Sequence, residues 1–324
     1  MKNCKFSVII PVKQQNKYFD QTVTSLLKGS FTDFEIIILP DSYKNNPYPK
    51  TQIIPTGNVG PAKKRDIGAK IAKGEFLAFI DDDAYPSKNW LKTVLSLFKD
   101  DNITAVCGPG ITPPDDDIFQ KVSGWVSSTK IGMAANTYRF IPEKERFVDD
   151  YPSMNLIVRK TDFNALGGFD TNYWPGEDTK LCLDIVKILK KKIIYHPGVL
   201  VFHHRRPIFK EHLLQNGRYG LHRGYFAKIL PETSFRFSYL PPPLFAIGFF
   251  VGPLFYFLNK NIFFMYLLIL FSYLFMILVT SYYIFIKEKN ILVSLLFIPA
   301  VVATHLFYGV KFLQGFFLTT KLKR

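Results

Sequence analysis

One uncharged apolar stretch constrains this chain more than any other feature. Ile262–Ile286 contains 25 residues and no Asp, Glu, Lys or Arg. A helix rises about 1.5 Å per residue, so this stretch is long enough to cross a hydrocarbon core of about 30 Å. A second apolar stretch, 291–310, has a similar length, and a third, 244–258, is shorter. We therefore expect a C-terminal membrane region with transmembrane helices, residues 236–324, after a separate domain, residues 1–235.

The basic residues near these stretches predict how the membrane region is oriented. Lys and Arg close to the ends of spans favour the cytosolic side. The basic tail 311–324 outweighs Lys287 and Lys289, which favours two spans with 244–258 lying in the interface, whereas the length of the apolar run favours three. No signal peptide precedes the strand-like Phe6–Pro11, so we expect the preceding domain in the cytosol and the anchor in the plasma membrane of a prokaryote.

The region before the anchor alternates short apolar runs with helical patterns. This alternation predicts an α/β fold with a mostly parallel sheet that is covered on both faces. The expected strands are 6–10, 34–39, 51–54, 76–80, 154–158, 193–195 and 199–202. The expected helices are 22–27, 61–74, 118–133, 161–166 and 174–192. The charged segment 143–150 is expected to be irregular and mobile.

Carboxylates follow two of the expected strands. Asp41 comes after the second strand, and Asp81, Asp82 and Asp83 follow the fourth strand directly. Parallel strands present their carboxyl ends at one edge of the sheet, where ligands of such sheets bind. Two carboxylates on one turn can share a divalent cation, Mg²⁺ or Mn²⁺, with the phosphates of a nucleotide. The pattern therefore predicts a metal-assisted nucleotide site at this edge.

Basic and imidazole side chains accompany the acidic cluster. Lys63, Lys64 and Arg65 fall in the first turn of the helix that Pro61 begins, where backbone N–H groups and basic side chains can meet a diphosphate. A solvated basic helix face would explain them as well. His203 ends an expected strand and could join the metal, contact a donor phosphate or serve the fold alone.

The charge balance points to an anionic partner. The chain has 41 Lys and Arg against 26 Asp and Glu, a formal net charge of +15. No zinc-finger, RNP or recognition-helix signature accompanies this charge, so we expect no nucleic-acid partner. Anionic lipid fits better beside a membrane anchor. Cys4, Cys107 and Cys182 form no CxxC pair, and we expect them to be reduced thiols.

Together these motifs resemble glycosyltransferase family 2. The resemblance covers roughly residues 5–206. It is carried, in order, by Phe6-Ser-Val-Ile-Ile-Pro11, Glu35-Ile-Ile-Ile38, Gly60-Pro-Ala-Lys-Lys-Arg65, Phe79-Ile-Asp-Asp-Asp83, Gly167-Gly-Phe-Asp170 and Gly176-Glu-Asp178. It implies a GT-A-type fold and transfer of a sugar from a nucleotide donor with inversion.

The resemblance also assigns residues to the donor side of the site. It implies that Pro11, Asp41, Arg65, Asp81 and Asp82 contact the donor. Within that group Asp41 would contact the base, Arg65 the diphosphate and Asp81 the ribose.

The remaining assignments concern the metal and the acceptor. The resemblance implies that Asp83 holds the metal and that Asp178 is the general base. Asn155, Trp174 and Glu177 would lie on the acceptor side.

The chain departs from the family pattern in three places. Pro40 stands where the family often has a first Asp before Asp41. The frequent Ala-Arg-Asn is here Lys64-Arg65-Asp66. The Gln-x-x-Arg-Trp motif of polymerising synthases is matched only by Gln215-Asn-Gly-Arg218-Tyr219, so we infer no processive polymerase. Arg218 could contact a phosphate of the donor or a lipid headgroup.

The leading hypothesis is an inverting glycosyltransferase, of the hexosyltransferase type, that acts on a membrane-associated, lipid-linked saccharide. A metal-dependent nucleotidyltransferase is an alternative, but it would more naturally carry a glycine-rich phosphate loop, and residues 11–28 contain no glycine. A non-catalytic membrane scaffold with a degenerate nucleotide fold is the second alternative.

Overall fold

The computed structural model describes residues 4–14, 16–43, 48–173 and 176–322, and it divides into two compact units. The first consists of Met1–Ile111 and Ile141–His204, and the second of Thr112–Phe140 and Arg205–Lys323. Each unit is therefore built from two separate stretches of chain. The expected division at residue 235 between a cytosolic domain and a membrane region stays a prediction.

The first unit is built around a large sheet. Its strands lie in the order β3 (Thr51–Ile53), β2 (Phe34–Leu39), β1 (Phe6–Pro11), β4 (Phe76–Ile80), β9 (Asn155–Arg159), β6 (Ile103–Cys107), β10 (Lys192–Tyr195) and β8 (Arg146–Val148). Neighbours pair in parallel from β3 to β4 and again between β6 and β10. β9 runs antiparallel between β4 and β6, and β8 pairs antiparallel with β10. The expected α/β fold with a mostly parallel sheet is confirmed as a mixed, mostly parallel one.

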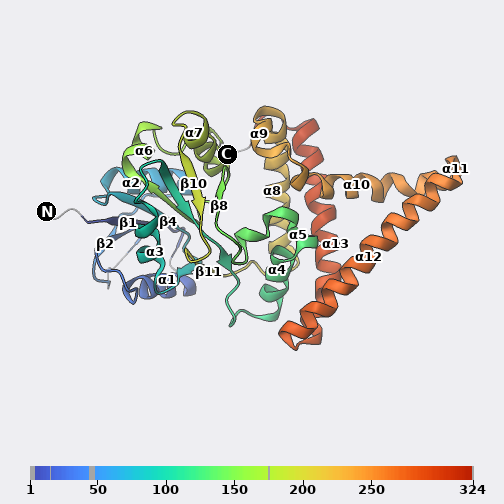
Figure 1. Ribbon diagram of the computed structural model, residues 1–324, viewed down its shortest axis with the longest axis horizontal. Coiled ribbons are helices and arrows are strands. Elements are labelled where there is room, and N and C mark those ends of the chain that lie inside the picture. Colours follow the sequence, from blue (N-terminus) through green and yellow to red (C-terminus); the bar gives the residue numbers. More distant parts are fainter. Residues whose placement is uncertain (1–3, 15, 44–47, 174–175, 323–324) are drawn as a thin grey trace. The chain divides into compact units, whose positions relative to one another are not determined.

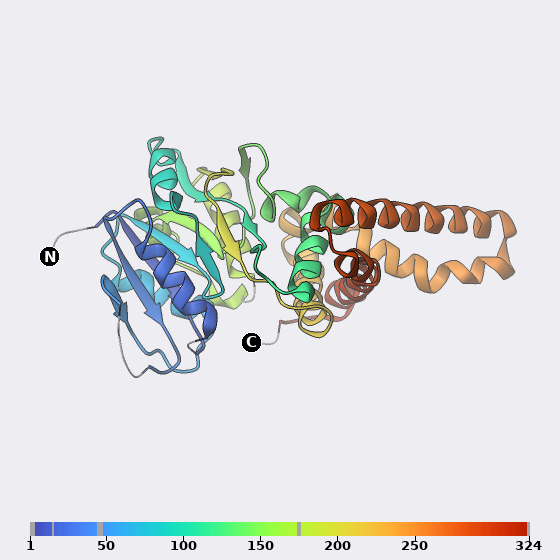
Figure 2. The ribbon, with the colours of Figure 1, turned by 90° about the horizontal axis from the view of Figure 1, so that it is seen from below.

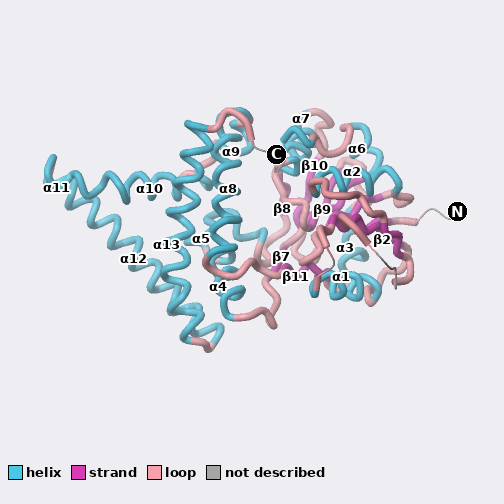
Figure 3. Tube along the Cα trace, turned by 180° about the vertical axis from the view of Figure 1, so that it is seen from behind, coloured by secondary structure: helices cyan, strands magenta, loops and turns pink. Residues whose placement is uncertain are grey.

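Helices cover both faces of this sheet, which explains why the central strands are buried and mostly apolar. Every residue of β1 and β4 is buried. Val8 and Ile10 share a core cluster with residues of α1 (Lys17–Leu27) and α3 (Trp90–Leu97). Ile9 points the other way, against Gly68 of α2 (Pro61–Ile71). Figures 1 and 3 show these layers, with α6 (Lys160–Ala165) and α7 (Glu177–Lys187) on the α2 side.

A small second sheet lies beside the end of β4. β11 (Val201–His203) pairs antiparallel with β5 (Ala84–Pro86) and parallel with β7 (Gly110–Ile111). The register places His203 opposite Ala84, the residue after the acidic cluster. This pairing brings a late part of the chain to the carboxyl end of β4.

The structure corrects several details of the sequence prediction. The helix expected at 174–192 ends at Lys187, and Lys192 begins β10. The segment 143–150 is not irregular throughout, because Arg146–Val148 forms β8 on Ile193–Tyr195 of β10. The helix expected at 118–133 is divided at Thr129 into α4 (Ile118–Ser128) and α5 (Lys130–Met133). Extended backbone at Thr129 ends α4, and its side chain accepts a hydrogen bond from the N–H of Gly132 in α5.

The second unit is helical in the residues that the structure describes. Besides α4 and α5 it contains α8 (Lys210–Ile229), α9 (Pro231–Ser234), α10 (Pro241–Val251), α11 (Phe255–Leu258), α12 (Lys260–Glu288) and α13 (Ile291–Leu313). The turn η4 (Gly252–Leu254) joins α10 to α11, and η5 (Gln314–Leu318) extends α13. Figures 1 and 2 show α10 and α12 as the two arms of a hairpin, which are joined at α11 and diverge toward their other ends in the view of Figure 1.

Three of these helical stretches are long and apolar enough to cross a membrane. They are Pro241–Leu258, Lys260–Glu288 and Ile291–Leu318, with mean hydropathies of 1.5, 2.7 and 2.1. Each contains one of the apolar stretches found in the sequence. Their length and composition indicate association with a membrane.

Candidate active site

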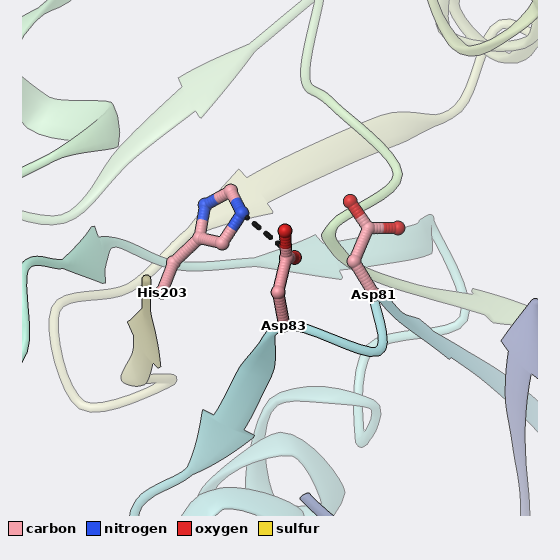
Figure 4. Close-up of side chains that lie close together, drawn as sticks. All are labelled: Asp81, Asp83 and His203. Atoms are coloured by element: carbon pink, nitrogen blue, oxygen red, sulfur yellow. Dashed lines mark hydrogen bonds and ion pairs between the residues drawn. The ribbon is translucent and has the colours of Figure 1, made fainter. Parts of the chain in front are cut away.

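The acidic cluster after β4 meets a histidine from β11. Ligand atoms of Asp81, Asp83 and His203 all lie within 4.8 Å of one another. Nε2 of His203 is 3.1 Å from Oδ1 of Asp83. Figure 4 shows the three side chains pointing toward one another. The sequence predicts the two aspartates at this place, but it leaves the role of His203 open.

The donor atoms of this cluster fit a divalent cation. The two carboxylates suit Mn²⁺ and Mg²⁺, whereas the imidazole, a softer ligand, favours Mn²⁺ over Mg²⁺. The side chains of Asp81, Asp83 and His203 are 30%, 12% and 16% exposed, so the cluster is partly sheltered but open to a ligand. Two carboxylates this close together repel each other unless a cation or a proton offsets their charge. Asp83, the predicted metal ligand, is the more buried of the two.

Asp82 faces away from this cluster toward α1. Its Oδ2 accepts a hydrogen bond of 2.6 Å from Nδ2 of Asn16, the residue that caps α1. Burial raises the pKa of Asp82 to about 7, and the charges of Asp83 and Asp81 add to this shift. The expected donor contact of Asp82 stays a prediction.

Arg65 connects the acidic cluster to the start of α7. Its Nη2 lies 2.7 Å from Oδ1 of Asp81, and its Nη1 lies 3.3 Å from Oε1 of Glu177. The residue is 4% exposed because α2 carries it on the face that packs against the sheet. Among the residues that the structure describes, its Nε is a buried nitrogen without a hydrogen-bond partner. Contact with a diphosphate remains predicted.

Lys64, beside Arg65, is buried and ion-paired rather than solvated. It is 3% exposed. Its ammonium group forms an ion pair with Asp41 and donates to the carbonyl oxygen of Val12. Lys64 therefore holds Asp41 at the carboxyl end of β2, next to Pro11 at the end of β1. Because β1, β2 and β4 are parallel, the two acidic strand ends lie at one edge of the sheet, as predicted.

The two acidic residues at the start of α7 have different surroundings. Glu177 is 5% exposed, and burial raises its pKa to about 7, with a further contribution from the charge of Asp178. Asp178 is half-buried, and its two oxygens accept hydrogen bonds from the N–H groups of Thr179 (2.8 Å) and Ser153 (3.2 Å). The backbone thus fixes the orientation of the Asp178 carboxylate, while Glu177 is fixed by Arg65.

Asn155 lies inside the protein. It is 0% exposed, and its Nδ2 donates to the carbonyl oxygens of Gly108 (2.6 Å) and Val199 (2.8 Å). Its Oδ1 accepts a hydrogen bond of 2.9 Å from Nε1 of Trp90. These contacts hold three segments of the first unit together. The predicted acceptor-side role is untested, and this placement does not favour it.

Two further predicted residues are not among the described residues of the first unit. Trp174 falls outside the described residues. Arg218 is exposed on α8, in the second unit. Its predicted contact with a phosphate therefore stays a prediction.

Sequence reasoning missed several polar residues around His204, the neighbour of His203. The ring of His204 stacks on Tyr18 with centroids 4.0 Å apart, and its Nε2 lies 2.9 Å from Oε1 of Gln21. Both partners belong to α1, whose cap Asn16 also holds Asp82. The only signal in the sequence is that Asn16 precedes an apolar helical pattern, which is typical of a helix cap.

The sequence of this chain is similar to those of known glycosyltransferases. Residues 7–161 match the family described as Glycosyl transferase family 2. The chain is 36% identical over 101 residues to poly(ribitol-phosphate) beta-N-acetylglucosaminyltransferase TarS of Staphylococcus aureus, a match over 27% of this chain and 18% of that protein. It is 27% identical over 164 residues to pre-mycofactocin glycosyltransferase of Mycobacterium tuberculosis, covering 50% of this chain and 33% of that protein. The matches thus cover only a fifth to a third of these relatives.

A relative of more similar length and a solved structure extend the comparison. The chain is 23% identical over 224 residues to glucosyl-dolichyl phosphate glucuronosyltransferase of Haloferax volcanii, covering 61% of this chain and 69% of that protein. The structure of the mannosyltransferase PcManGT from Pyrobaculum calidifontis, in complex with GDP-Man and Mn²⁺, superposes with a TM-score of 0.54. It shares 14% sequence identity and covers 94% of this chain and 88% of that one. The two proteins share a fold.

Proposed function

Because the chain belongs to glycosyltransferase family 2 through residues 7–161 and has a GT-A-like fold, we propose that it transfers a sugar from a nucleotide-diphosphate donor to a membrane-associated acceptor, a lipid-linked saccharide, with inversion. One observation carries this proposal. Asp81, Asp83 and His203 converge at the carboxyl end of β4, and Arg65 joins Asp81 to the acidic start of α7. Arg65 would therefore link the proposed donor site to the helix that carries the proposed base.

On the donor side, the strand ends supply the contacts. Asp41, held by Lys64, would contact the base, and Pro11 lies opposite Leu39, two residues before Asp41. Arg65 offers a buried guanidinium for the diphosphate. Asp83, Asp81 and His203 would hold Mn²⁺ or Mg²⁺, which when bound would offset negative charge on the donor phosphates. The complex of PcManGT with GDP-Man and Mn²⁺ supports this assignment.

On the acceptor side, Asp178 would act as general base. An acceptor hydroxyl is a weak nucleophile, so a carboxylate within hydrogen-bond reach must take its proton. The oxygen would form a bond to the anomeric carbon as the bond to the nucleotide diphosphate breaks, and the proton would pass to Asp178. The N–H groups of Ser153 and Thr179 keep this carboxylate oriented without neutralising it. Direct displacement by one acceptor oxygen inverts the anomeric centre.

The lipid-linked acceptor is supported by two observations. The three apolar helical stretches of the second unit indicate membrane association. The Haloferax volcanii relative is named for transfer to a glucosyl-dolichyl phosphate. With its anchor in a membrane, the catalytic domain would meet an acceptor that diffuses in the same bilayer, and a cytosolic position would give it access to nucleotide sugars.

A panel of donors tests the donor half of the proposal. The purified full chain is heated with UDP-, GDP- or dTDP-sugars in the presence of Mn²⁺, because a bound donor raises the unfolding temperature by mass action. One donor class is expected to stabilise the protein, and the stabilisation should be lost in Asp83→Ala. Asp101→Ala, at a side chain that is 99% exposed, is the matched control. If no donor distinguishes the wild type from Asp83→Ala, the donor site lies elsewhere.

The selected donor then tests the reaction. With a lipid extract that contains lipid-linked saccharides, the enzyme should release a nucleoside diphosphate and yield a product whose new bond has the opposite anomeric configuration to the donor. Release of a sugar 1-phosphate instead would show that the nucleotidyl group is transferred, as by a nucleotidyltransferase. Retention of configuration would contradict the role of Asp178.

A further inference from the structure

The last of the three candidate spans is packed differently from the other two. In its most apolar window, Ile291–Leu318 is 39% buried within the protein, whereas Lys260–Glu288 is 6% and Pro241–Leu258 is 17% buried. A helix that crosses lipid on its own exposes its side chains to the hydrocarbon. The side chains of α12 are almost all exposed within the protein, whereas α13 with η5 is partly covered by other helices of the second unit.

One of the helices that cover α13 is α8, which runs beside it in the same direction (Figure 1). Nε2 of His212, early in α8, lies 2.9 Å from Oγ1 of Thr304. Further along, the backbone of Gly224 lies against the carbonyl group of Phe312. At the end of α8, Nζ of Lys228 donates to the carbonyl oxygen just beyond η5. Residue numbers increase in the same direction along both helices. Each residue in the second half of α13 therefore lies at the same depth relative to a membrane as the residues of α8 that it contacts.

The first half of α13 is covered by α4. Val122 and Val126 of α4 belong to one apolar cluster with Phe297 and Val301 of α13. Oγ of Ser123 also lies 2.7 Å from Nδ1 of the same histidine of α8 that contacts α13. Helices α4, α8 and α13 are therefore joined by apolar packing and by a buried polar contact.

α8 cannot lie in hydrocarbon. Its 20 residues span about 30 Å. Exposed charged side chains are found at its start, its middle and its end, at Lys210, Glu211, Arg218 and Lys228. Charged side chains at the level of the hydrocarbon core are costly and rare. Since α13 shares its depth with α8, it cannot cross the core without carrying these charges with it.

Each arm of the hairpin has one end packed against α13 or α4, the helices that lie in water or among lipid headgroups. At its start, α10 places Pro242 against Gly309 of α13. At its end, α12 places Oε1 of Glu288 within 2.9 Å of Nε1 of Trp125 in α4. Between these ends, the hairpin exposes apolar side chains, among them Phe257 at its tip, which is 82% exposed.

We propose that α13 with η5 lies along the membrane surface together with α4 and α8, and that the hairpin of α10, α11 and α12 is the part that enters the bilayer. Of the exposed charged residues of α8, three are basic and one is acidic, which suits anionic headgroups. The partner of this surface is an anionic lipid bilayer. Both ends of α13 then lie on one side of the membrane, unlike in the two-span and three-span arrangements that the sequence suggests.

Thiol labelling of the full chain in the membranes of intact bacterial cells tests this proposal. The background carries Cys4→Ser and keeps Cys107 and Cys182, which are buried. Single cysteines replace Lys88 in the first unit, Lys289 before α13, Thr320 after η5 and Phe257 at the hairpin tip; in the structure all four are exposed. A membrane-impermeant maleimide is added before or after permeabilisation, and an alkaline wash checks that each variant stays in the membrane.

The proposal expects one labelling pattern for Lys88→Cys, Lys289→Cys and Thr320→Cys, and a different one for Phe257→Cys, which should react from the other side or not at all. Labelling of Lys289→Cys from the opposite side to Lys88→Cys would establish two spans and overturn it. If Thr320→Cys, but not Lys289→Cys, were labelled from the opposite side to Lys88→Cys, this would establish three spans and would also overturn the proposal. A Phe257→Cys variant that reacts like Lys88→Cys would show that the hairpin stays outside the bilayer. None of these results depends on sugar transfer, so the labelling and the proposed function succeed or fail separately.

Discussion

Nη1 of Arg65 lies 3.3 Å from Oε1 of Glu177, and both side chains are almost completely buried. The two residues are 112 positions apart in the chain. Through this ion pair α2, which carries the predicted diphosphate contact, fixes the start of α7, which carries the predicted base. A displacement of Arg65 on the donor side would therefore shift the start of α7 on the acceptor side.

The buried Glu177 makes stability depend on pH. Burial raises its pKa from 4.5 to about 7, so between these values the folded protein binds a proton that the unfolded chain has released. Stability therefore falls as pH rises through this range, with a limiting slope of about 1.4 kcal/mol per pH unit. In urea unfolding from pH 4.5 to 7.5, the free energy of unfolding of the wild type should fall relative to that of Glu177→Gln. Asp101→Asn, at an exposed side chain, should track the wild type, and a constant wild-type-to-Gln difference would refute the assignment.

His203 should contribute to metal affinity. The cluster predicts that His203→Ala weakens Mn²⁺ binding by at least about 10-fold, a loss typical when a group that binds or orients a metal is removed. His196→Ala, at a histidine in the turn after β10, is the matched control and should bind Mn²⁺ normally. Titration of Mn²⁺ followed by electron paramagnetic resonance measures both affinities without an activity assay. Equal affinities in the two variants would remove His203 from the metal site.

Asp178→Asn should separate catalysis from donor binding. The substitution keeps the size of the side chain and removes most of its basicity, so turnover should fall by a factor of at least about 10² while the donor still stabilises the protein. Asp184→Asn, on the same helix and paired with Lys180, should keep near wild-type turnover. Near wild-type transfer by Asp178→Asn would place the base on another residue.

A substitution of Asn155 tests whether this residue stabilises the fold or contacts the acceptor. Asn155→Ala leaves the carbonyl group of Val199 and the indole N–H of Trp90 without their partner, while the carbonyl oxygen of Gly108 keeps the hydroxyl of Tyr151. At about 1–3 kcal/mol for each of these two buried groups, the loss of stability should be about 2 kcal/mol or more. The KM for the acceptor should not change in the fraction that stays folded, and Asn164→Ala, at an exposed position, is the control. A raised acceptor KM with unchanged stability would support the acceptor-side role instead.

The sequence predicts the strands around the site well because their signal is local. β1, β2 and β4 are mostly apolar runs, interrupted only by Ser7 and Glu35, and their parallel order follows from the alternation with helices. It does not predict β8, because Arg146–Val148 is short and polar and becomes a strand only by pairing with β10. It leaves His203 undecided because its place beside Asp83 depends on a pairing between β11 and β5 across more than a hundred residues.

Long-range contact also explains what the sequence cannot show in the second unit. Gly217, Gly220 and Gly224 lower the helical propensity of α8, so its pattern gives a weak helix signal. These glycines lie where the backbone or side chains of α13 approach closely, and the partner supplies the stability that propensity does not. Hydropathy alone cannot distinguish α13 from α12, because it measures composition and not what covers the helix.

The position of β9 in the sheet has a consequence for synthesis of the protein. β4 and β6 flank β9, yet both leave the ribosome well before residues 155–159 are made. Until then each has an open edge, and the sheet cannot close. The segment 112–140, which belongs to the other unit, emerges during this interval and waits for partners that begin at residue 205. Contacts between residues so distant in sequence form slowly, so a nascent chain shorter than about half the protein should expose unpaired strands and depend on chaperones.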